Sequence, residues 1–253
     1  MFSTGDYIIG IVAALIVGLS KTALPGAGLL ATPLLAMVFA GRQIPGATLP
    51  ILLVADLFAV TWYRKWARWD ALKPLIPWVS LGYLAGAIFF IVVGKAARPV
   101  EISIGCFILL VVALQVWRMW RAAPSVEPTL GAAAGYGAAG GFTTFVSNNA
   151  GPIMNTYLMR LGLDKEELVG STALFYFVVN ASKIPFYVAI GAWSDGGAFF
   201  TRASLKYDAL MIPAVLISVY LGRSLFTRLP QRLFRILVLV LAAASAIKLL
   251  IGA

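Results

Sequence analysis

The sequence predicts an all-α, polytopic membrane protein built from two repeated halves, the second inverted relative to the first. Of its 253 residues, 61% are hydrophobic and 12% are charged, whereas a soluble domain has about 25% charged residues. The hydrophobic residues form runs long enough to cross a bilayer as helices. Two of these runs are interrupted by Gly, Pro or Asn at matching places, which in membrane proteins indicates paired broken helices.

Residues 1–120 form the predicted first repeat. It opens with an apolar run over 6–40, which exceeds the roughly 20 residues of one crossing and fits a broken helix or a re-entrant hairpin. The break lies at Pro25-Gly26-Ala27-Gly28. Three further spans are expected, at 46–63, 72–94 and 99–120. The polar segment 121–129 then serves as a linker.

Residues 130–253 form the predicted second repeat, which follows the same plan. A long Gly-rich run over 130–161 is broken at Ser147-Asn148-Asn149. Further spans are expected at 168–191, 205–229 and 233–252. Matching residues recur at two fixed offsets. At an offset of 123 these are Gly18 and Gly141, Gly28 and Gly151, and Thr48 and Ser171; at an offset of 136 they are Pro77 and Pro213, and Gly86 and Gly222.

The loop charges favour re-entrant first runs. If each long run crossed the membrane once, the loop Lys and Arg residues would divide evenly between the two sides. If each run turns at its break and returns, twelve fall on one side against six on the other, and that side is expected to be cytoplasmic. The twelve are Arg64, Lys65, Arg68, Lys73, Arg118, Arg121, Arg160, Lys165, Arg223, Arg228, Arg232 and Arg235.

Composition also excludes several functions. The chain has no His, which rules out His-dependent triads, His metal sites and His proton relays, and its single cysteine, Cys106, has no internal disulfide partner. We therefore expect no metal and no cofactor. The net charge of +10 fits membrane topology and lipid contact. No nucleic-acid motif accompanies it, so no nucleic-acid partner is expected.

The two breaks predict an anion site. A half-helix that starts inside the membrane presents free N–H groups and the positive end of its dipole. In the first break, Gly26 and Gly28 allow close approach of the backbone. In the second, Ser147, Asn148 and Asn149 add neutral donors. The alternative is that such glycines only let helices pack closely.

Three ionisable residues lie inside apolar runs, where a charge usually marks function or a buried partner. Lys21 precedes the first break, and Lys183 shares a helix face with Asn180, three residues earlier. Both lysines and Asn180 are candidate ligands of an anion. Asp56 is the clear mid-span carboxylate, and it fits equally a counter-charge for Lys21 or a proton carrier.

The pattern resembles a known family. The Gly46-Ala47-Thr48 and Gly170-Ser171-Thr172 starts after each broken segment, Asn180 before Lys183-Ile184-Pro185, and the late Gly86 and Gly222 are similar to those of the sulfite exporter TauE/SafE family of bacterial membrane permeases. The resemblance implies transport of sulfur-containing anions such as sulfite, sulfonates or sulfoacetate, outward and with proton coupling as an option. It also implies a bacterial inner-membrane location.

The sequence thus predicts a multi-pass permease, with a small anion and membrane lipids as partners. A homodimer is compatible with the sequence but has no specific signal in it. The alternative function is a membrane-embedded enzyme acting on a lipid. That reading lacks support, because no carboxylate pair occurs at helical spacing inside a span, and we expect no enzymatic activity. A scaffold protein would not explain matched intramembrane breaks and charges.

Overall fold

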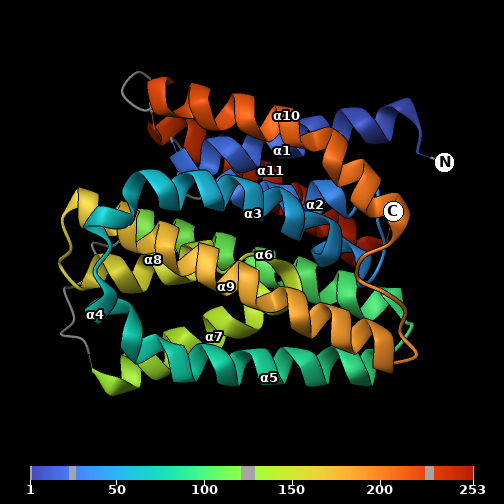
Figure 1. Cartoon of the computed structure of the whole chain (residues 1–253), viewed down its shortest axis with the longest axis horizontal. Coiled ribbons are helices and arrows are strands. Elements are labelled where there is room, and N and C mark those ends of the chain that lie inside the picture. Colours follow the sequence, from blue (N-terminus) through green and yellow to red (C-terminus); the bar gives the residue numbers. More distant parts are fainter. Residues whose placement is uncertain (1, 23–26, 121–128, 226–230, 253) are drawn as a thin grey trace.

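The computed structural model describes residues 2–22, 27–120, 129–225 and 231–252, and within them it contains helices but no strands (Figure 1). The α-helices are α1 Thr4–Thr22, α2 Ala31–Leu35, α3 Gln43–Tyr63, α4 Trp69–Leu72, α5 Ile76–Val93, α6 Ala97–Trp120, α7 Leu130–Ser147, α8 Gly151–Arg160, α9 Lys165–Trp193, α10 Arg202–Leu225 and α11 Gln231–Ile251. Short 3-10 turns are η1 Ala27–Leu30, η2 Arg64–Trp66 and η3 Lys73–Leu75.

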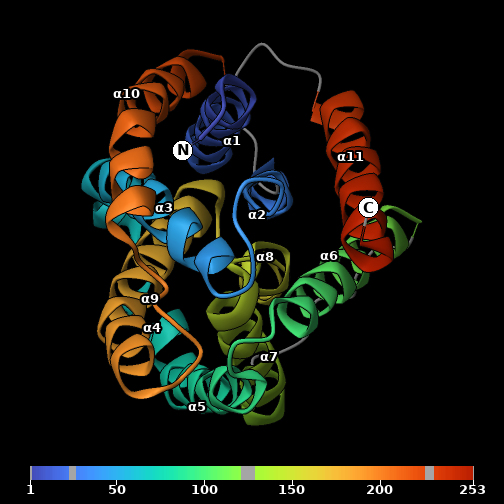
Figure 2. The same ribbon diagram turned by 90° about the vertical axis from the view of Figure 1, so that its right-hand side faces the viewer.

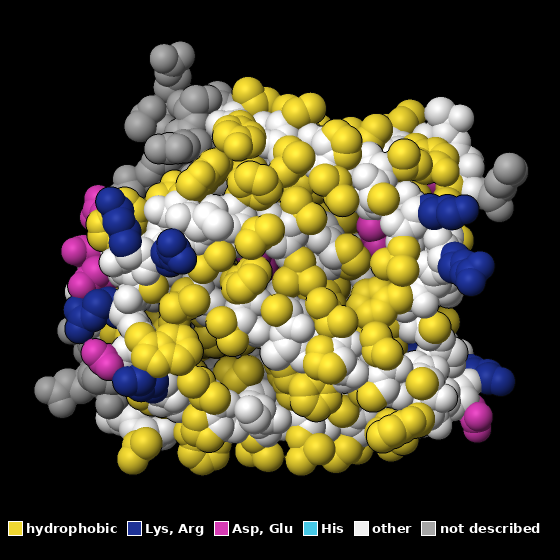
Figure 3. Space-filling view, viewed as in Figure 1, with side chains coloured by type: hydrophobic (Ala, Val, Ile, Leu, Met, Phe, Trp, Pro, Cys, Tyr) yellow, Lys and Arg dark blue, Asp and Glu magenta, His cyan; other side chains and the backbone are white. Residues whose placement is uncertain are grey.

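The chain is a multi-pass membrane protein. Among the described residues, six helices are long and apolar enough to cross a bilayer: Thr4–Thr22, Gln43–Trp66, Trp69–Val93, Ala97–Trp117, Glu166–Trp193 and Arg202–Gly222. Their axes follow the long direction of the molecule, and charged side chains gather at its two ends with a broad apolar band between them (Figure 3). This distribution matches a bilayer with polar interfaces at both ends.

The two ends of the molecule carry different connections. At the end that we call the linker end, the chain passes from α3 to α5, from α6 to α7, from α8 to α9 and from α10 to α11 (left in Figure 1). The opposite end, called the terminal end, carries both chain termini and the other connections (right in Figure 1). Of the Lys and Arg residues expected to be cytoplasmic, those that belong to the described helices and turns lie at the linker end, whereas Arg121 and Arg228 lie outside the described residues.

Each half opens with a helical hairpin. The first hairpin, α1 to α2, begins and ends at the terminal end, where the ring of Phe39 lies 5.5 Å from that of Phe2. The second, α7 to α8, begins and ends at the linker end, where the Arg160 guanidinium lies 5.7 Å from the Tyr136 ring. The two hairpins therefore enter the molecule from opposite ends.

The second hairpin is well specified by local sequence. The Thr129 hydroxyl caps α7 by accepting a hydrogen bond from the Ala132 N–H, at 3.1 Å. Helix α7 ends at Ser147 and is capped by Asn148, whose φ of 57° is the left-handed conformation that Asn tolerates better than most residues. Helix α9 then starts with a capping box between Asp164 and Glu167.

Each hairpin packs on a helix of the other half. Helix α1 runs parallel to α10, and α7 runs parallel to α5. Equivalent glycines make close approaches in both pairs: a Cβ on Gly18 would lie 2.8 Å from the Val215 carbonyl oxygen, and one on Gly141 would lie 2.4 Å from that of Val79. The glycines are separated by the offset of 123 and the valines by the offset of 136. An inverted repeat would produce this pairing.

Candidate functional site

The second break meets the first hairpin inside the molecule, at the start of α2. The Thr32 hydroxyl of α2 donates a hydrogen bond to the Ser147 carbonyl at the end of α7, at 2.8 Å. Beside it, the Asn148 side-chain amide donates to the Pro45 carbonyl, at 3.0 Å. These two bonds tie the break of the second half to the first hairpin and to α3, so that the interrupted backbone is buried in protein, as a membrane interior requires.

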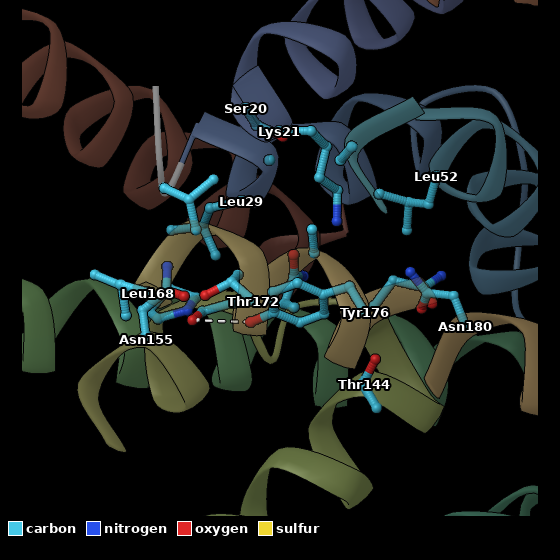
Figure 4. Close-up of a pocket in the computed structure, with 18 of the residues that line it drawn as sticks. Ser20, Lys21, Leu29, Leu52, Thr144, Asn155, Leu168, Thr172, Tyr176 and Asn180 are labelled. Atoms are coloured by element: carbon cyan, nitrogen blue, oxygen red, sulfur yellow. Dashed lines mark hydrogen bonds between the residues drawn. The ribbon is translucent and has the colours of Figure 1, made fainter. Parts of the chain in front are cut away.

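A cavity of about 290 Å³ lies beside this meeting point (Figure 4). It is lined by residues from α1, η1, α3, α7, α8 and α9: Ser20, Lys21, Gly28, Leu29, Leu52, Ala59, Thr144, Asn148, Asn149, Gly151, Pro152, Asn155, Met159, Leu168, Val169, Thr172, Ala173, Tyr176 and Asn180. The lining reaches from mid-membrane to Met159 and Leu168, where α8 gives way to α9. The cavity therefore extends toward the linker end.

Lys21 enters the cavity as part of a buried ion pair. Its ammonium lies 2.7 Å from an Asp56 carboxylate oxygen, and the Asp56 side chain is fully buried whereas that of Lys21 is 14% exposed. The other Asp56 oxygen accepts a hydrogen bond from the Asn180 side-chain amide, at 2.5 Å. The carboxylate thus sits behind Lys21, and the ammonium faces the open space.

An aromatic ring supports Lys21 on its other side. The Lys21 ammonium lies 4.4 Å from the centre of the Tyr176 ring, within cation–π range. In Figure 4 the two side chains point toward each other across the cavity. The Tyr176 hydroxyl donates a hydrogen bond to the Gly151 carbonyl, at 3.1 Å, which fixes the ring against the start of α8.

Lys183 lies just behind the cavity wall. Its side chain is fully buried, and its ammonium donates to the Thr144 hydroxyl and carbonyl, each at 3.2 Å, and to the Asn148 side-chain oxygen. All three acceptors belong to Thr144 and Asn148, which line the cavity. Lys183 therefore holds the second break in place.

Several polar atoms of the lining have no hydrogen-bond partner in the protein. They are both side-chain amide atoms of Asn149, the side-chain oxygen of Asn155 and the hydroxyl of Thr172. Buried polar atoms are normally paired with protein, water or a ligand. The start of α8, at Gly151 and Pro152, also faces the cavity, and there the helix dipole is positive.

The electrostatic character of the cavity follows from these residues. Among the described residues that line it, Lys21 is the one charged side chain, and the rest are apolar, hydroxyl or amide groups. The described part of the chain also contains no cluster of three His, Cys, Asp or Glu residues suited to a metal. A small anion would meet one ammonium, neutral donors and the positive end of a helix.

The sequence-predicted site residues are gathered closely, with two exceptions. Lys21, Gly28, Asn148, Asn149 and Asn180 line the cavity, and Asp56 and Lys183 contact residues that do. Gly26 lies outside the described residues. Ser147 is fully buried, and its hydroxyl donates a hydrogen bond to the Thr143 carbonyl rather than facing the cavity. Its carbonyl accepts the hydrogen bond from Thr32 of α2.

Sequence reasoning missed Tyr176, Thr172 and Asn155. The first two precede Asn180 at steps of four residues along α9, which places all three on one helix face. That spacing was an available signal. Asn155 lies four residues after Gly151 on α8. This spacing places it on the same helix face as the start of α8 at the break, which was also visible in the sequence.

Comparison with known proteins agrees with this architecture. Residues 10–249 match the family model described as sulfite exporter TauE/SafE, which covers nearly the whole chain. No curated protein and no solved structure matches the chain. The family is one of membrane transporters, which fits a multi-pass helical protein with an intramembrane cavity between two broken segments. The chain belongs to the sulfite exporter TauE/SafE family.

Proposed function

We propose that this transporter moves a small sulfur-containing oxyanion, of the sulfite, sulfonate or sulfoacetate type, through the central cavity. The observation that carries the proposal is Lys21, an ammonium facing an intramembrane cavity with no acidic side chain among its described lining residues. A charge at this depth costs several kcal/mol unless it serves binding or pairing. Its buried partner Asp56 leaves the open side of the ammonium available.

The donors of the cavity suit an oxyanion. A sulfite or sulfonate group presents several oxygens that accept hydrogen bonds, and the Asn149 amide and Thr172 hydroxyl are polar groups without partners in the protein. The volume of about 290 Å³ corresponds to roughly ten water molecules at about 30 Å³ each. The cavity therefore has room for a small anion with part of its hydration shell.

Asp56 has two proposed roles that act on the same charge. As a counter-charge it holds Lys21 in place when the cavity is empty. As a proton carrier it would lose its negative charge on protonation, and Lys21 would then attract an anion more strongly. Proton binding and anion binding would favour each other by the same factor, as linkage requires. Proton coupling is thus a property to test at this residue.

Direction of transport follows from the membrane potential and the proposed orientation. If the linker end is cytoplasmic, as the positive-inside rule favours, the cavity opens inward. A potential negative on that side drives a singly charged anion outward by about 2.3 kcal/mol per 100 mV. We propose export across the bacterial inner membrane on this basis.

We further propose that residues 1–120 and 130–253 are inverted repeats joined by the linker 121–129. The equivalent glycine contacts of α1 and α7 support this. Membership of a transporter family favours transport over the alternative of a lipid-modifying enzyme. A homodimer remains a prediction, which the mass of the protein in nanodiscs would test.

The decisive experiment is flux in proteoliposomes. We would measure sulfite and sulfoacetate movement for the wild type, for Lys21→Gln and for Lys206→Gln, an exposed lysine of α10 that serves as a charge-matched control. We expect Lys21→Gln to lose most of the flux and Lys206→Gln to keep it. Flux of neither anion by the wild type, or unchanged flux in folded Lys21→Gln, would contradict the proposal.

A further inference from the structure

A second cavity opens at the terminal end, away from the central one. Its volume is about 230 Å³. Three connections form it, those from α2 to α3, from α5 to α6 and from α9 to α10, which converge on the face shown in Figure 2. Its lining residues are Ala40, Gly41, Arg42, Gln43, Gly94, Lys95, Ala96, Ala97, Gly196, Gly197 and Ala198.

Arg42 is the buried charge of this cavity. Only 4% of the residue is exposed. Its guanidinium donates to the Ser194 hydroxyl at 2.5 Å, to the Gly197 carbonyl at 3.4 Å and to the Phe90 carbonyl. Its Nε has no partner. Within the described part of the chain it forms no ion pair with a carboxylate, and burial lowers the pKa of the guanidinium from its ordinary value.

The loop backbone is shaped around the guanidinium. A Cβ on Gly196 would lie 1.8 Å from the Arg42 Cζ and 2.1 Å from each terminal nitrogen, so only glycine leaves room there. Each of the three loops also contains a glycine with positive φ: Gly41 at 56°, Gly94 at 58° and Gly197 at 80°. The site is therefore built by the local sequence of all three loops.

The surroundings of Arg42 are positive on balance. Lys95 lines the same cavity, and no acidic residue is among the described lining residues. Asp195, the residue before Gly196 of the lining, is exposed and is not itself part of the lining. The 24-residue helix α6 also begins at Ala97, in the wall of the cavity, and its dipole adds positive potential.

Aromatic rings separate this cavity from the central one. The rings of Tyr187 and Phe199 are stacked, with centroids 4.2 Å apart, and Phe90 meets Phe199 edge to face at 4.8 Å. The Tyr187 hydroxyl donates to the Phe145 carbonyl, one residue after Thr144 of the central cavity wall. Arg42 lies over Phe90 and Phe199, at 6.0 and 5.7 Å from their centroids.

We propose that the cavity at the terminal end is a second oxyanion site, with Arg42 as its main ligand and Lys95 as a supporting charge. Arg suits this role because its planar fork binds oxyanions with two parallel hydrogen bonds. An oxyanion that takes up the guanidinium nitrogens competes with the Ser194 and Gly197 acceptors. A role for this site as the outer binding site of the transport path rests on the proposed function. Binding of an oxyanion at the site does not depend on it.

The test is equilibrium binding of sulfite to the full-length protein in zwitterionic phosphatidylcholine nanodiscs, by calorimetry. We expect two binding events in the wild type. Arg42→Gln should weaken one of them roughly tenfold or more, because a charge-assisted hydrogen bond is lost. Gly196→Ala should weaken the same event with the charge retained, because the added methyl displaces the guanidinium. Lys206→Gln, a charge-matched control at the same end, should keep both events.

The outcomes separate this proposal from the function of the central cavity. Lys21→Gln should remove the other event and leave the Arg42-dependent one. A single event that Lys21→Gln removes and Arg42→Gln leaves unchanged would overturn the second site alone. A single event with the reverse dependence would support the second site and contradict binding at the central cavity. No binding in the wild type would overturn both.

A free oxyanion and a lipid phosphate share the chemistry that this site recognises. Repeating the titration in nanodiscs of anionic phosphatidylglycerol distinguishes the two sources. If the Arg42-dependent event is unchanged, the site takes a soluble oxyanion. If it weakens with anionic lipid in the wild type but the Lys21-dependent event does not, the headgroup phosphate is the natural occupant of the site.

Discussion

Replacing Asp56 with Asn is expected to tighten anion binding at the central cavity while lowering transport. The substitution keeps the shape of the side chain and leaves one acceptor oxygen in place of the two that face Lys21 and Asn180, and it removes the negative charge 2.7 Å from the Lys21 ammonium. Lys21→Gln is expected to have the opposite effect on binding. Two neighbouring residues would thus change the same affinity in opposite directions.

The magnitude follows from the geometry of the ion pair. An oxyanion hydrogen-bonded to the open side of Lys21, at about 2.8 Å, would lie roughly 5.5 Å from the Asp56 carboxylate if the ammonium is between them. At an effective dielectric constant of about 20, two unit charges at that separation repel by roughly 3 kcal/mol. Removing this repulsion corresponds to a gain in affinity of about 100-fold, since 1.4 kcal/mol is tenfold.

The assay is equilibrium binding of radiolabelled sulfite to the protein in nanodiscs, with flux measured in proteoliposomes. We expect Asp56→Asn to bind between tenfold and 100-fold more tightly, because water in the cavity screens part of the repulsion. Its flux should fall, since a tightly held anion leaves slowly. Any acceleration of wild-type flux by a pH gradient should also disappear.

The reasoning would be refuted if folded Asp56→Asn bound sulfite as the wild type does, or more weakly. In that case the carboxylate would not act on the anion through Lys21. The double variant Lys21→Gln/Asp56→Asn serves as the control. It should bind more tightly than Lys21→Gln, because the carboxylate that the single variant leaves unpaired still repels an anion in the cavity.

Three further outcomes are expected. Gly141→Ala should lower stability by about 1–3 kcal/mol through overpacking against α5, whereas Gly135→Ala, with no atom within 4 Å of its new Cβ, should not. Thermal unfolding in detergent measures both variants, and equal effects would contradict the packing argument. Tyr176→Phe removes one hydrogen bond worth about 1 kcal/mol but keeps the ring at Lys21, so unfolding should shift slightly and sulfite affinity should stay within about threefold. Lys183→Met leaves two or more buried acceptors unpaired, at about 1–3 kcal/mol each, so it should reduce stability and flux. It should weaken sulfite binding less than Lys21→Gln does, and an equal loss of affinity would place Lys183 in direct contact with the anion.

The sequence predicted the class of fold, and it singled out most of the residues that gather at the candidate site, because both depend on local pattern. Apolar runs with few charges define the spans, and a break inside such a run is recognisable from Gly, Pro and Asn alone. Lys21 and Asp56 were recognisable for the same reason, since an ionisable residue inside an apolar run stands out. For Asp56 the sequence left open a counter-charge for Lys21 or a proton carrier, and the structure contains the Lys21–Asp56 ion pair.

Other features of the site depend on tertiary packing and could not be predicted. Lys183 was expected to act beside Asn180, but it reaches across to α7 and holds Asn148, because the second hairpin inserts next to α9. Arg42 closely follows the first apolar run in the sequence, and its burial arises from three loops that are distant in sequence. Tyr176 was overlooked because a tyrosine within an apolar span is an ordinary residue until the cavity places Lys21 above it.

The pairing of each hairpin with a helix of the other half has a consequence for how the protein is made. Helix α1 is completed by α10, and the Tyr207 hydroxyl reaches the Asp6 carbonyl across 201 residues of sequence. During synthesis the face of α1 that carries Gly10 and Gly18 therefore stays without its α10 neighbour until almost the whole chain has been inserted. Folding of the first half is finished by the second, so a chain stopped at the linker would leave α1 and α5 without the neighbours that their glycine contacts require.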